Sequence, residues 1–358
     1  MNPEQPRILL VRLSAVGDCL HAVPVLVELR RRFPQATLGW AVEEGPYDLL
    51  RGHPLIDRFH LYPRRAFKRR QGSWLERLRL LGAFRRELRA VRYDIAIDLQ
   101  GLAKSGLVTW WSNAPRRIGF AGAESRELNW LFVNRRVSVP AQCVHVVERN
   151  LALLGALDIP PPARPQWVMP DFAAEDAEME GFLAPLGLGR APGRRPFAVV
   201  NPGASWKTKR WPAERFGAVA RGLLERARMP AVVTWAGEEE QTAAATIVQT
   251  AALPDVHVAP PTGLRQLAAL LARAELFVGN DTGPLHLAVA LGIRSVAVFG
   301  ASDPLRNGPY GDGHLVQVGK PECHPCWKKT CARGDLACLM DVPASAVLDS
   351  CARLLDRV

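Results

Sequence analysis

The chain has 358 residues, of which 48% are hydrophobic and 23% are charged, and its formal net charge at pH 7 is +11. This length predicts two domains of about 150 residues each, and the charge favours phosphorylated ligands, nucleic acid or an anionic membrane surface as partners. The first apolar run, Ile8–Val11, is cut by Arg12, and the longest, Leu285–Gly300, is interrupted by His286 and Arg294. We therefore expect no secretory signal and no membrane span, and a cytoplasmic location.

Short apolar runs alternate with helical patterns through both halves of the chain, which is typical of βαβ units with parallel sheets. The runs that predict strands are Ile8–Leu13, Leu38–Val42, Asp94–Leu99, Phe197–Asn201, Ala231–Ala236, Leu276–Gly279 and Ser295–Phe299. We expect an α/β chain with two Rossmann-like domains that face each other across a cleft. The loops at the strand ends of both domains would then surround one ligand.

A proline-rich segment, Asp158–Pro170, marks the expected domain boundary because it holds five prolines. We expect an N-terminal domain over residues 1–170 and a C-terminal domain over residues 171–342, with a cysteine-rich loop at 320–340. The last residues, 343–358, predict an amphipathic helix that packs back on the N-terminal domain.

The first predicted strand leads into Ser14–Asp18, with the sequence SAVGD, and a helical pattern follows it. Ligands bind at this edge of an open parallel sheet, where a helix N-terminus offers free backbone N–H groups to an anion. Asp18 is therefore a candidate for chemistry. The alternative is a helix cap, because aspartate at a helix start accepts a hydrogen bond from an unpaired backbone N–H.

The segment from Arg64 to Arg92 is strongly basic and has only Glu76 and Glu87 as acidic residues. Its basic residues are Arg64, Arg65, Lys68, Arg69, Arg70, Arg77, Arg79, Arg85, Arg86, Arg89 and Arg92. One helix face is apolar and is expected to pack on the protein. This face consists of Trp74, Leu78, Leu81, Phe84, Leu88 and Val91. The arginines then either cover a solvated surface or meet the phosphates of an acceptor or of anionic lipid.

Two loops in the second half of the chain join a predicted strand to a predicted helix. In Asn280–His286, Thr282 and Gly283 offer backbone N–H groups to a diphosphate, and His286 adds a further donor. A capped helix without a ligand is the alternative for these residues.

The second loop, Asn201–Pro212, contains small residues that let a ligand approach the backbone, Gly203, Ala204 and Ser205. Lys209 supplies a compact positive charge, which can replace a metal ion in stabilising a departing nucleoside diphosphate. Glu238 follows the next predicted strand and is a candidate to bind a ribose or sugar hydroxyl.

Four of the seven cysteines lie close together with the spacing C-x2-C-x4-C-x6-C. They are Cys323, Cys326, Cys331 and Cys338. This cluster argues against a disulfide framework, and in a reducing compartment it allows a structural zinc site. An iron–sulfur cluster and plain reduced thiols are the alternatives.

Four motifs occur in the order found in bacterial lipopolysaccharide heptosyltransferases. They are SAVGD at Ser14–Asp18, DLQGLAKSG at Asp98–Gly106, KRWP at Lys209–Pro212 and NDTGPLHL at Asn280–Leu287. From about Arg7 to Gly311 the chain therefore resembles glycosyltransferase family 9. The similarity to heptosyltransferase I is greatest through Gly119–Glu127 and His145–Asn150.

This resemblance implies a GT-B fold and an inverting, metal-independent transfer of heptose from ADP-heptose to an inner-core lipopolysaccharide of the Kdo-lipid A type. The enzyme would work at the cytoplasmic face of the inner membrane, with no cofactor and no nucleic acid partner. The implied general base is Asp18, and Lys209 is implied to hold the departing diphosphate. The implied donor contacts are Ala204, Ser205, Glu238, Asp281, Thr282, Gly283 and His286. The implied acceptor contacts are Ser14, Gly17, Gln100, Lys104 and Arg126.

Other functions stay open on the sequence. A family member with another nucleotide sugar or another acceptor fits the same motifs. A basic module that binds nucleic acid or a membrane explains the arginines, but it gives no role to Asp18 or Lys209. A nucleotide-dependent oxidoreductase is disfavoured, because no G-x-G-x-x-G motif follows a strand.

Overall fold

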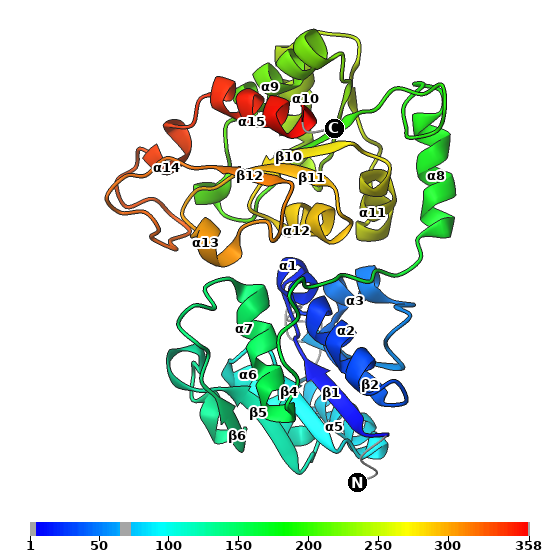
Figure 1. Cartoon of the computed structure of the whole chain (residues 1–358), viewed down its shortest axis with the longest axis vertical. Coiled ribbons are helices and arrows are strands. Elements are labelled where there is room, and N and C mark those ends of the chain that lie inside the picture. Colours follow the sequence, from blue (N-terminus) through cyan, green and yellow to red (C-terminus); the bar gives the residue numbers. More distant parts are fainter. Residues whose placement is uncertain (1–4, 65–72, 357–358) are drawn as a thin grey trace. The chain divides into compact units, whose positions relative to one another are not determined.

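The computed structural model describes residues 5–64 and 73–356. The chain divides into two compact units, Met1–Asp171 and Phe172–Val358. Each unit is built on one six-stranded sheet in which every pairing of neighbouring strands is parallel, and helices lie on the faces of the sheet (Figure 1). The two units are therefore α/β domains of the same architecture.

The sheet of the first unit has the strand order β3-β2-β1-β4-β5-β6. Its strands are β1 Arg7–Val11, β2 Thr37–Glu43, β3 Arg58–Tyr62, β4 Ile95–Asp98, β5 Arg116–Phe120 and β6 Arg135–Val137. Its α-helices are α1 Val16–Leu20, α2 Val23–Arg32, α3 Glu44–Leu50, α5 Trp74–Val91, α6 Ala103–Trp111 and α7 Val146–Ala152. The side chains of Ile8–Val11 are fully buried, as expected for a central parallel strand that is covered on both faces.

The sheet of the second unit has the strand order β12-β11-β10-β7-β8-β9. Its strands are β7 Ala198–Asn201, β8 Ala231–Val233, β9 Val256–Val258, β10 Leu276–Asn280, β11 Arg294–Val298 and β12 His314–Gln317. Its α-helices are α8 Ala173–Leu183, α9 Ala213–Ala227, α10 Glu238–Ala251, α11 Leu264–Ala272, α12 Gly283–Ala290, α13 Pro304–Asn307, α14 Ala337–Met340 and α15 Ala344–Leu355.

The C-terminal helix α15 packs within the second unit, against α9, β11 and β12. The buried side chains of Val347, Cys351 and Leu354 belong to the core of that unit. A Cβ atom on Gly222 of α9 would lie 2.5 Å from a methyl group of Leu348, so the glycine lets the two helices approach closely. The apolar face of residues 343–358 therefore completes the core of their own unit, and packing of this segment on the N-terminal domain stays a prediction.

The helix α5 differs from the sequence prediction in its first half. Phe84 and Leu88 are buried, but Trp74 and Leu78 are exposed. The packed face thus covers only the second half of the helix, where α5 meets β3 and α6. Four basic residues of the segment from Arg64 to Arg92 lie outside the described residues, namely Arg65, Lys68, Arg69 and Arg70. Among the helices of residues 5–64 and 73–356, none is both long enough and apolar enough to cross a membrane.

Candidate functional site

Three strands of the first unit end beside one another, because β2, β1 and β4 are neighbours in a parallel sheet. Asp18 follows β1, Glu43 is the last residue of β2, and Gln100 follows β4. Parallel strands present the loops that bind ligands at their carboxyl ends. The fold therefore brings these three polar side chains to one edge of the sheet.

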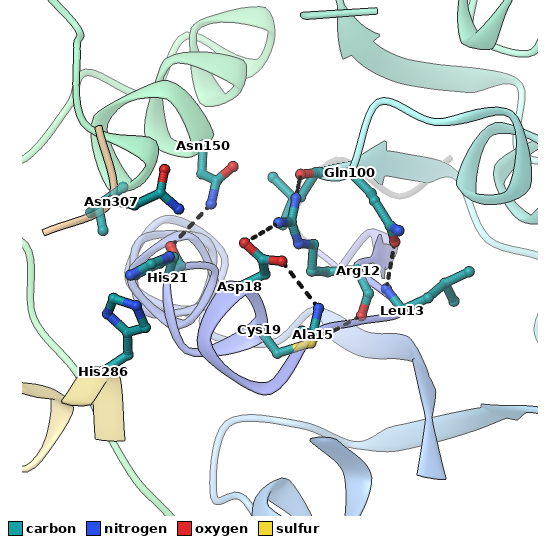
Figure 2. A network of polar contacts seen from close by, with 12 residues as sticks. Arg12, Leu13, Ala15, Asp18, Cys19, His21, Gln100, Asn150, His286 and Asn307 are labelled. Carbon is teal, nitrogen blue, oxygen red and sulfur yellow. Dashed lines mark hydrogen bonds and ion pairs between the residues drawn. The ribbon is translucent and has the colours of Figure 1, made fainter. Parts of the chain in front are cut away.

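Asp18 lies in the first turn of α1 and uses its two carboxylate oxygens differently (Figure 2). Its Oδ2 accepts a hydrogen bond of 3.1 Å from the backbone N–H of Ala15, while its Oδ1 lies 2.8 Å from Nη2 of Arg12. The side chain is 33% exposed. Both interpretations of the sequence therefore have a structural counterpart, because one oxygen caps the helix start and the carboxylate still reaches solvent.

Arg12 was not predicted as a site residue, although it fixes the position of Asp18. Its side chain is buried at the end of β1, and Nη1 donates a hydrogen bond to the carbonyl of Leu99. The backbone carbonyl of Arg12 accepts a hydrogen bond of 3.1 Å from Nε1 of Trp40. Leu99 thus holds the guanidinium and Trp40 holds the backbone of Arg12, so that a positive charge faces Asp18 from a buried position. A single arginine directly after an apolar run was the signal in the sequence.

The loop after β4 is organised by Asp98, which is fully buried. Its carboxylate accepts hydrogen bonds from the backbone N–H groups of Gln100 and Gly101, from Oγ of Ser105, and from Nδ2 of Asn129 at 2.6 Å. Burial raises the pKa of Asp98, and these four donors act in the opposite direction. This network fixes the conformation of the DLQGLAKSG loop. The buried carboxylate of Asp98 therefore has a structural role.

The predicted acceptor residues Gln100 and Lys104 both have protein partners. Oε1 of Gln100 accepts a hydrogen bond of 3.0 Å from the backbone N–H of Leu13. Nζ of Lys104 lies 2.5 Å from Glu43, and Arg64 pairs with the same carboxylate. The Glu43 side chain is only 3% exposed, so it is a buried anion that holds two cations at this edge. Sequence reasoning missed Glu43, although it directly follows the predicted strand Leu38–Val42.

The remaining predicted acceptor residues belong to the same loops. Ser14 is half-buried and Gly17 is buried, both beside Asp18 in the chain. The side chain of Arg126 is exposed, and its backbone N–H donates a hydrogen bond of 2.8 Å to the carbonyl of Gly101. Arg126 is thus connected to the loop that carries Gln100 and Lys104.

In the second unit, Asp281 is the centre of a compact polar cluster and is 4% exposed. Nζ of Lys209 and Oγ of Ser302 each lie 2.5 Å from its Oδ2, and Nε2 of His286 lies 3.5 Å from its Oδ1. Burial acts to raise the pKa of Asp281, but His286 and Lys209 outweigh burial and hold it at about 2. The carboxylate therefore stays ionised and orients the lysine.

Asn280 joins the two loops that the sequence singled out in this half of the chain. Its Oδ1 accepts a hydrogen bond of 3.2 Å from the backbone N–H of Trp211, and its Nδ2 donates one of 2.7 Å to the carbonyl of Pro202. Thr282 is the residue before α12, and Gly283 is its first residue. The helix start and Lys209 are consequently brought together at the carboxyl end of β10.

The other predicted donor residues are less alike in their surroundings. Ala204 is buried, and its carbonyl accepts a hydrogen bond of 2.6 Å from Nε of Arg210, whereas Ser205 is exposed. Glu238 is the exposed first residue of α10. Glu240 is the half-buried glutamate here: it accepts a hydrogen bond of 2.9 Å from the backbone N–H of Ala236.

The four clustered cysteines are free thiols with different surroundings. Backbone N–H groups lower the pKa of Cys331, while burial raises the pKa of Cys338. Across the described part of the chain, no three or more His, Cys, Asp or Glu side chains are grouped so that they could hold a metal ion. The described positions of Cys323, Cys326, Cys331 and Cys338 therefore do not form the zinc site that their spacing allowed.

Comparison with known proteins decides the family. The family model described as glycosyltransferase family 9 (heptosyltransferase) matches residues 81–337. The chain belongs to glycosyltransferase family 9. The lipopolysaccharide heptosyltransferase 1 of Pseudomonas aeruginosa is 31% identical over 335 residues, which cover 91% of this chain and 87% of that relative. This family member is therefore a glycosyltransferase, as the four motifs predicted.

Solved structures agree with this assignment. The structure of Escherichia coli heptosyltransferase WaaC with ADP has a TM-score of 0.76 and 26% identity, and it covers 97% of this chain and 99% of that chain. The same enzyme with ADP-2-deoxy-2-fluoro heptose has a TM-score of 0.73 and 28% identity, with the same coverage. The two Rossmann-like units are those of the GT-B fold, which confirms the predicted fold class.

Proposed function

We propose that this enzyme transfers heptose from ADP-heptose to an inner-core lipopolysaccharide acceptor of the Kdo-lipid A type. The similar enzyme of Pseudomonas aeruginosa is a lipopolysaccharide heptosyltransferase 1, and a similar solved structure holds an ADP-heptose analogue. The reaction needs a base for the acceptor hydroxyl and positive charge for the departing diphosphate. The first unit has a suitable carboxylate, and the second has a suitable lysine.

Asp18 is the proposed general base. It would take the proton of the acceptor hydroxyl while that oxygen attacks the anomeric carbon, and the bond from this carbon to the diphosphate breaks. The stereochemistry at the anomeric carbon is inverted, because in a single displacement the new bond forms on the side opposite the leaving group. Its partly exposed carboxylate and its partner Arg12 support this role, since proton transfer needs both access and orientation.

Lys209 is proposed to stabilise the negative charge that develops on the departing diphosphate. The pairing with Asp281 at 2.5 Å supports this role, because it fixes the ammonium group before the ligand binds. Thr282 and Gly283 would add backbone N–H groups at the start of α12, and His286 would add a side-chain donor. This charge arrangement makes a metal ion unnecessary for the proposed chemistry.

The remaining assignments follow the charge of the ligands. Ala204, Ser205 and Glu238 are proposed to contact the nucleotide sugar. Ser14, Gly17, Gln100, Lys104 and Arg126 are proposed to contact the anionic acceptor. Because this acceptor is a glycolipid, the enzyme would work as a peripheral protein at the cytoplasmic face of the inner membrane.

The observation that carries this proposal is the Lys209–Asp281 pair at a strand end of a family 9 enzyme. Calorimetric titration with ADP, UDP, GDP and ADP-heptose tests it, with Lys209→Ala as the variant. We expect selective binding of ADP and ADP-heptose, at least tenfold weaker in the variant. Lys207→Ala is a matched control, because Lys207 is an exposed lysine two residues away. Preferential binding of UDP or GDP would contradict ADP-heptose as the donor and would indicate another nucleotide sugar.

A further inference from the structure

The net charge of the chain lies almost entirely in the first unit. Residues 1–171 contain 26 lysines and arginines against 16 aspartates and glutamates, a net charge of +10. Residues 172–358 contain 20 against 19, a net charge of +1. An anionic surface therefore attracts the first unit much more strongly than the second.

Exposed apolar side chains have the same uneven distribution. Of fourteen large apolar side chains exposed among the described residues, ten lie in the first unit. Four of these ten belong to the first half of α5, and they are Trp74, Leu75, Leu78 and Leu80. Trp74 is 68% exposed and Leu78 is 54% exposed. This is the part of α5 that the sequence predicted to be packed.

The helix start is well formed at this place. Oγ of Ser73 accepts a hydrogen bond of 3.1 Å from the backbone N–H of Leu75 and so caps α5. Trp74 and Leu78 are four residues apart and therefore lie on one side of the helix. The exposed apolar side chains are thus presented by a regular, capped helix.

Arginines adjoin this apolar surface. Arg79 lies four residues after Leu75, and Arg86 lies seven residues after Arg79, so both continue along the exposed side of the helix. Both arginines are exposed. Glu76 is two residues from Trp74 and faces away from it, but it neighbours Arg79 three residues later, so Arg86 is the arginine without an acidic neighbour in the first turn. Glu87 accepts a hydrogen bond of 2.6 Å from His60. We name Trp74, Leu75, Leu78, Arg79 and Arg86 the docking face.

We propose that the docking face binds an anionic lipid bilayer. Trp74 and Leu78 would enter the boundary between headgroups and acyl chains, and Arg79 and Arg86 would bind lipid phosphates. A tryptophan with leucines beside arginines suits an interfacial helix, because the bilayer offers an apolar layer directly below an anionic one. Nucleic acid offers phosphates but no such layer. This inference deepens the proposed function, since the proposed acceptor is itself a membrane glycolipid.

Sedimentation of the full chain with lipid vesicles tests the proposal. One set of vesicles contains phosphatidylethanolamine with about 30% phosphatidylglycerol, which resembles a charged membrane leaflet. The other set contains phosphatidylcholine alone. We expect binding to the anionic vesicles that weakens with salt. The double variant W74S/L78S should bind about 30-fold more weakly. Replacing Arg79 or Arg86 by glutamine should weaken binding about fivefold each.

The matched control is the double variant L305S/M340S, which removes two exposed apolar side chains of the second unit. It should bind vesicles like the wild type. Because all four substituted residues are exposed, the melting temperatures of the variants should change little. The variant Trp74→Phe should keep most of the vesicle binding that the variant Trp74→Ser loses. Equal binding by W74S/L78S and wild type, equal binding to neutral vesicles, or displacement by duplex DNA would each overturn the proposal.

A second readout separates the docking face from the proposed reaction. Transfer from ADP-heptose to an acceptor without acyl chains, measured without vesicles, should be equal in wild type and W74S/L78S. Vesicle binding without any such transfer would overturn the proposed function and leave the docking face intact. Transfer without vesicle binding would overturn the docking face alone.

Discussion

Asp18 and Asp281 hold matching places in the two sheets, yet their surroundings are opposite. Asp18 follows β1 and Asp281 follows β10, and each of these strands is the third in the order of its sheet. Asp18 is 33% exposed and has one ion-pair partner among the described residues, Arg12, whereas Asp281 is 4% exposed and is held by Lys209, His286 and Ser302. Burial and the number of partners, rather than residue type, therefore decide which of these carboxylates can exchange a proton.

The largest expected effect on stability concerns the buried carboxylate. Asp281→Asn removes the negative charge beside Lys209 and should lower the free energy of unfolding by about 3 kcal/mol, because a buried charge loses its partner. Urea unfolding at pH 7 measures this difference. Asp303→Asn is the control, since asparagine can keep the helix cap that Asp303 gives to Leu305. A loss no greater than that of the control would contradict the role of Asp281.

The same variant gives a pH test. The folded pKa of Asp281 is about 2, below its ordinary value of 3.8, so its stabilisation is present above pH 4 and lost as the pH falls toward 2. The contribution is about 2 kcal/mol. Unfolding measured from pH 5 down to pH 2.5 should show the wild type losing part of its advantage over Asp281→Asn. A constant difference would be inconsistent with the depressed pKa.

A smaller effect is expected at the partner of the exposed carboxylate. Arg12→Met should lower kcat about 30-fold, because Asp18 loses its fixed orientation, while KM for ADP-heptose changes little. Arg12→Lys should restore part of the loss. Arg30→Met serves as control, because Arg30 also pairs with an aspartate, Asp57, in the same unit. An equal fall of kcat in both methionine variants would mean that only stability had changed.

The smallest effect concerns the third carboxylate, Glu43, and the lysine that it holds. Lys104→Met should raise KM for the acceptor about tenfold and leave KM for ADP-heptose unchanged, because one charged hydrogen bond to the anionic acceptor is lost. Steady-state kinetics with each substrate varied in turn separate the two constants. A change in KM for ADP-heptose alone would contradict the proposed contact between Lys104 and the acceptor.

The sequence was sufficient for the fold class and for the central strands. All seven predicted strands overlap observed ones, because central parallel strands are continuous apolar runs. The strands that were missed include the edges β3, β6, β9 and β12. β3 and β6 carry charged residues, such as Arg58 and Arg135, which protect an edge but hide its pattern.

The site was predicted less completely than the fold. Motifs pointed to Asp18, Lys209 and Asp281, because each directly follows or precedes a recognisable element. Arg12 and Glu43 were missed, since their importance lies in contacts with residues far along the chain. The packing of α5 was also mispredicted, because helical spacing of apolar residues does not reveal how far a helix extends beyond its partners.

Turnover and nucleotide binding in Asp18→Asn test the role of Asp18 most directly. Because the exposed carboxylate is the proposed base, kcat should fall about a thousandfold, while the Kd for ADP stays within about twofold of the wild-type value. Asp48→Asn, at an exposed aspartate of α3, should leave both quantities unchanged. Wild-type turnover in Asp18→Asn would contradict the assignment of Asp18 as the base and the contrast with Asp281.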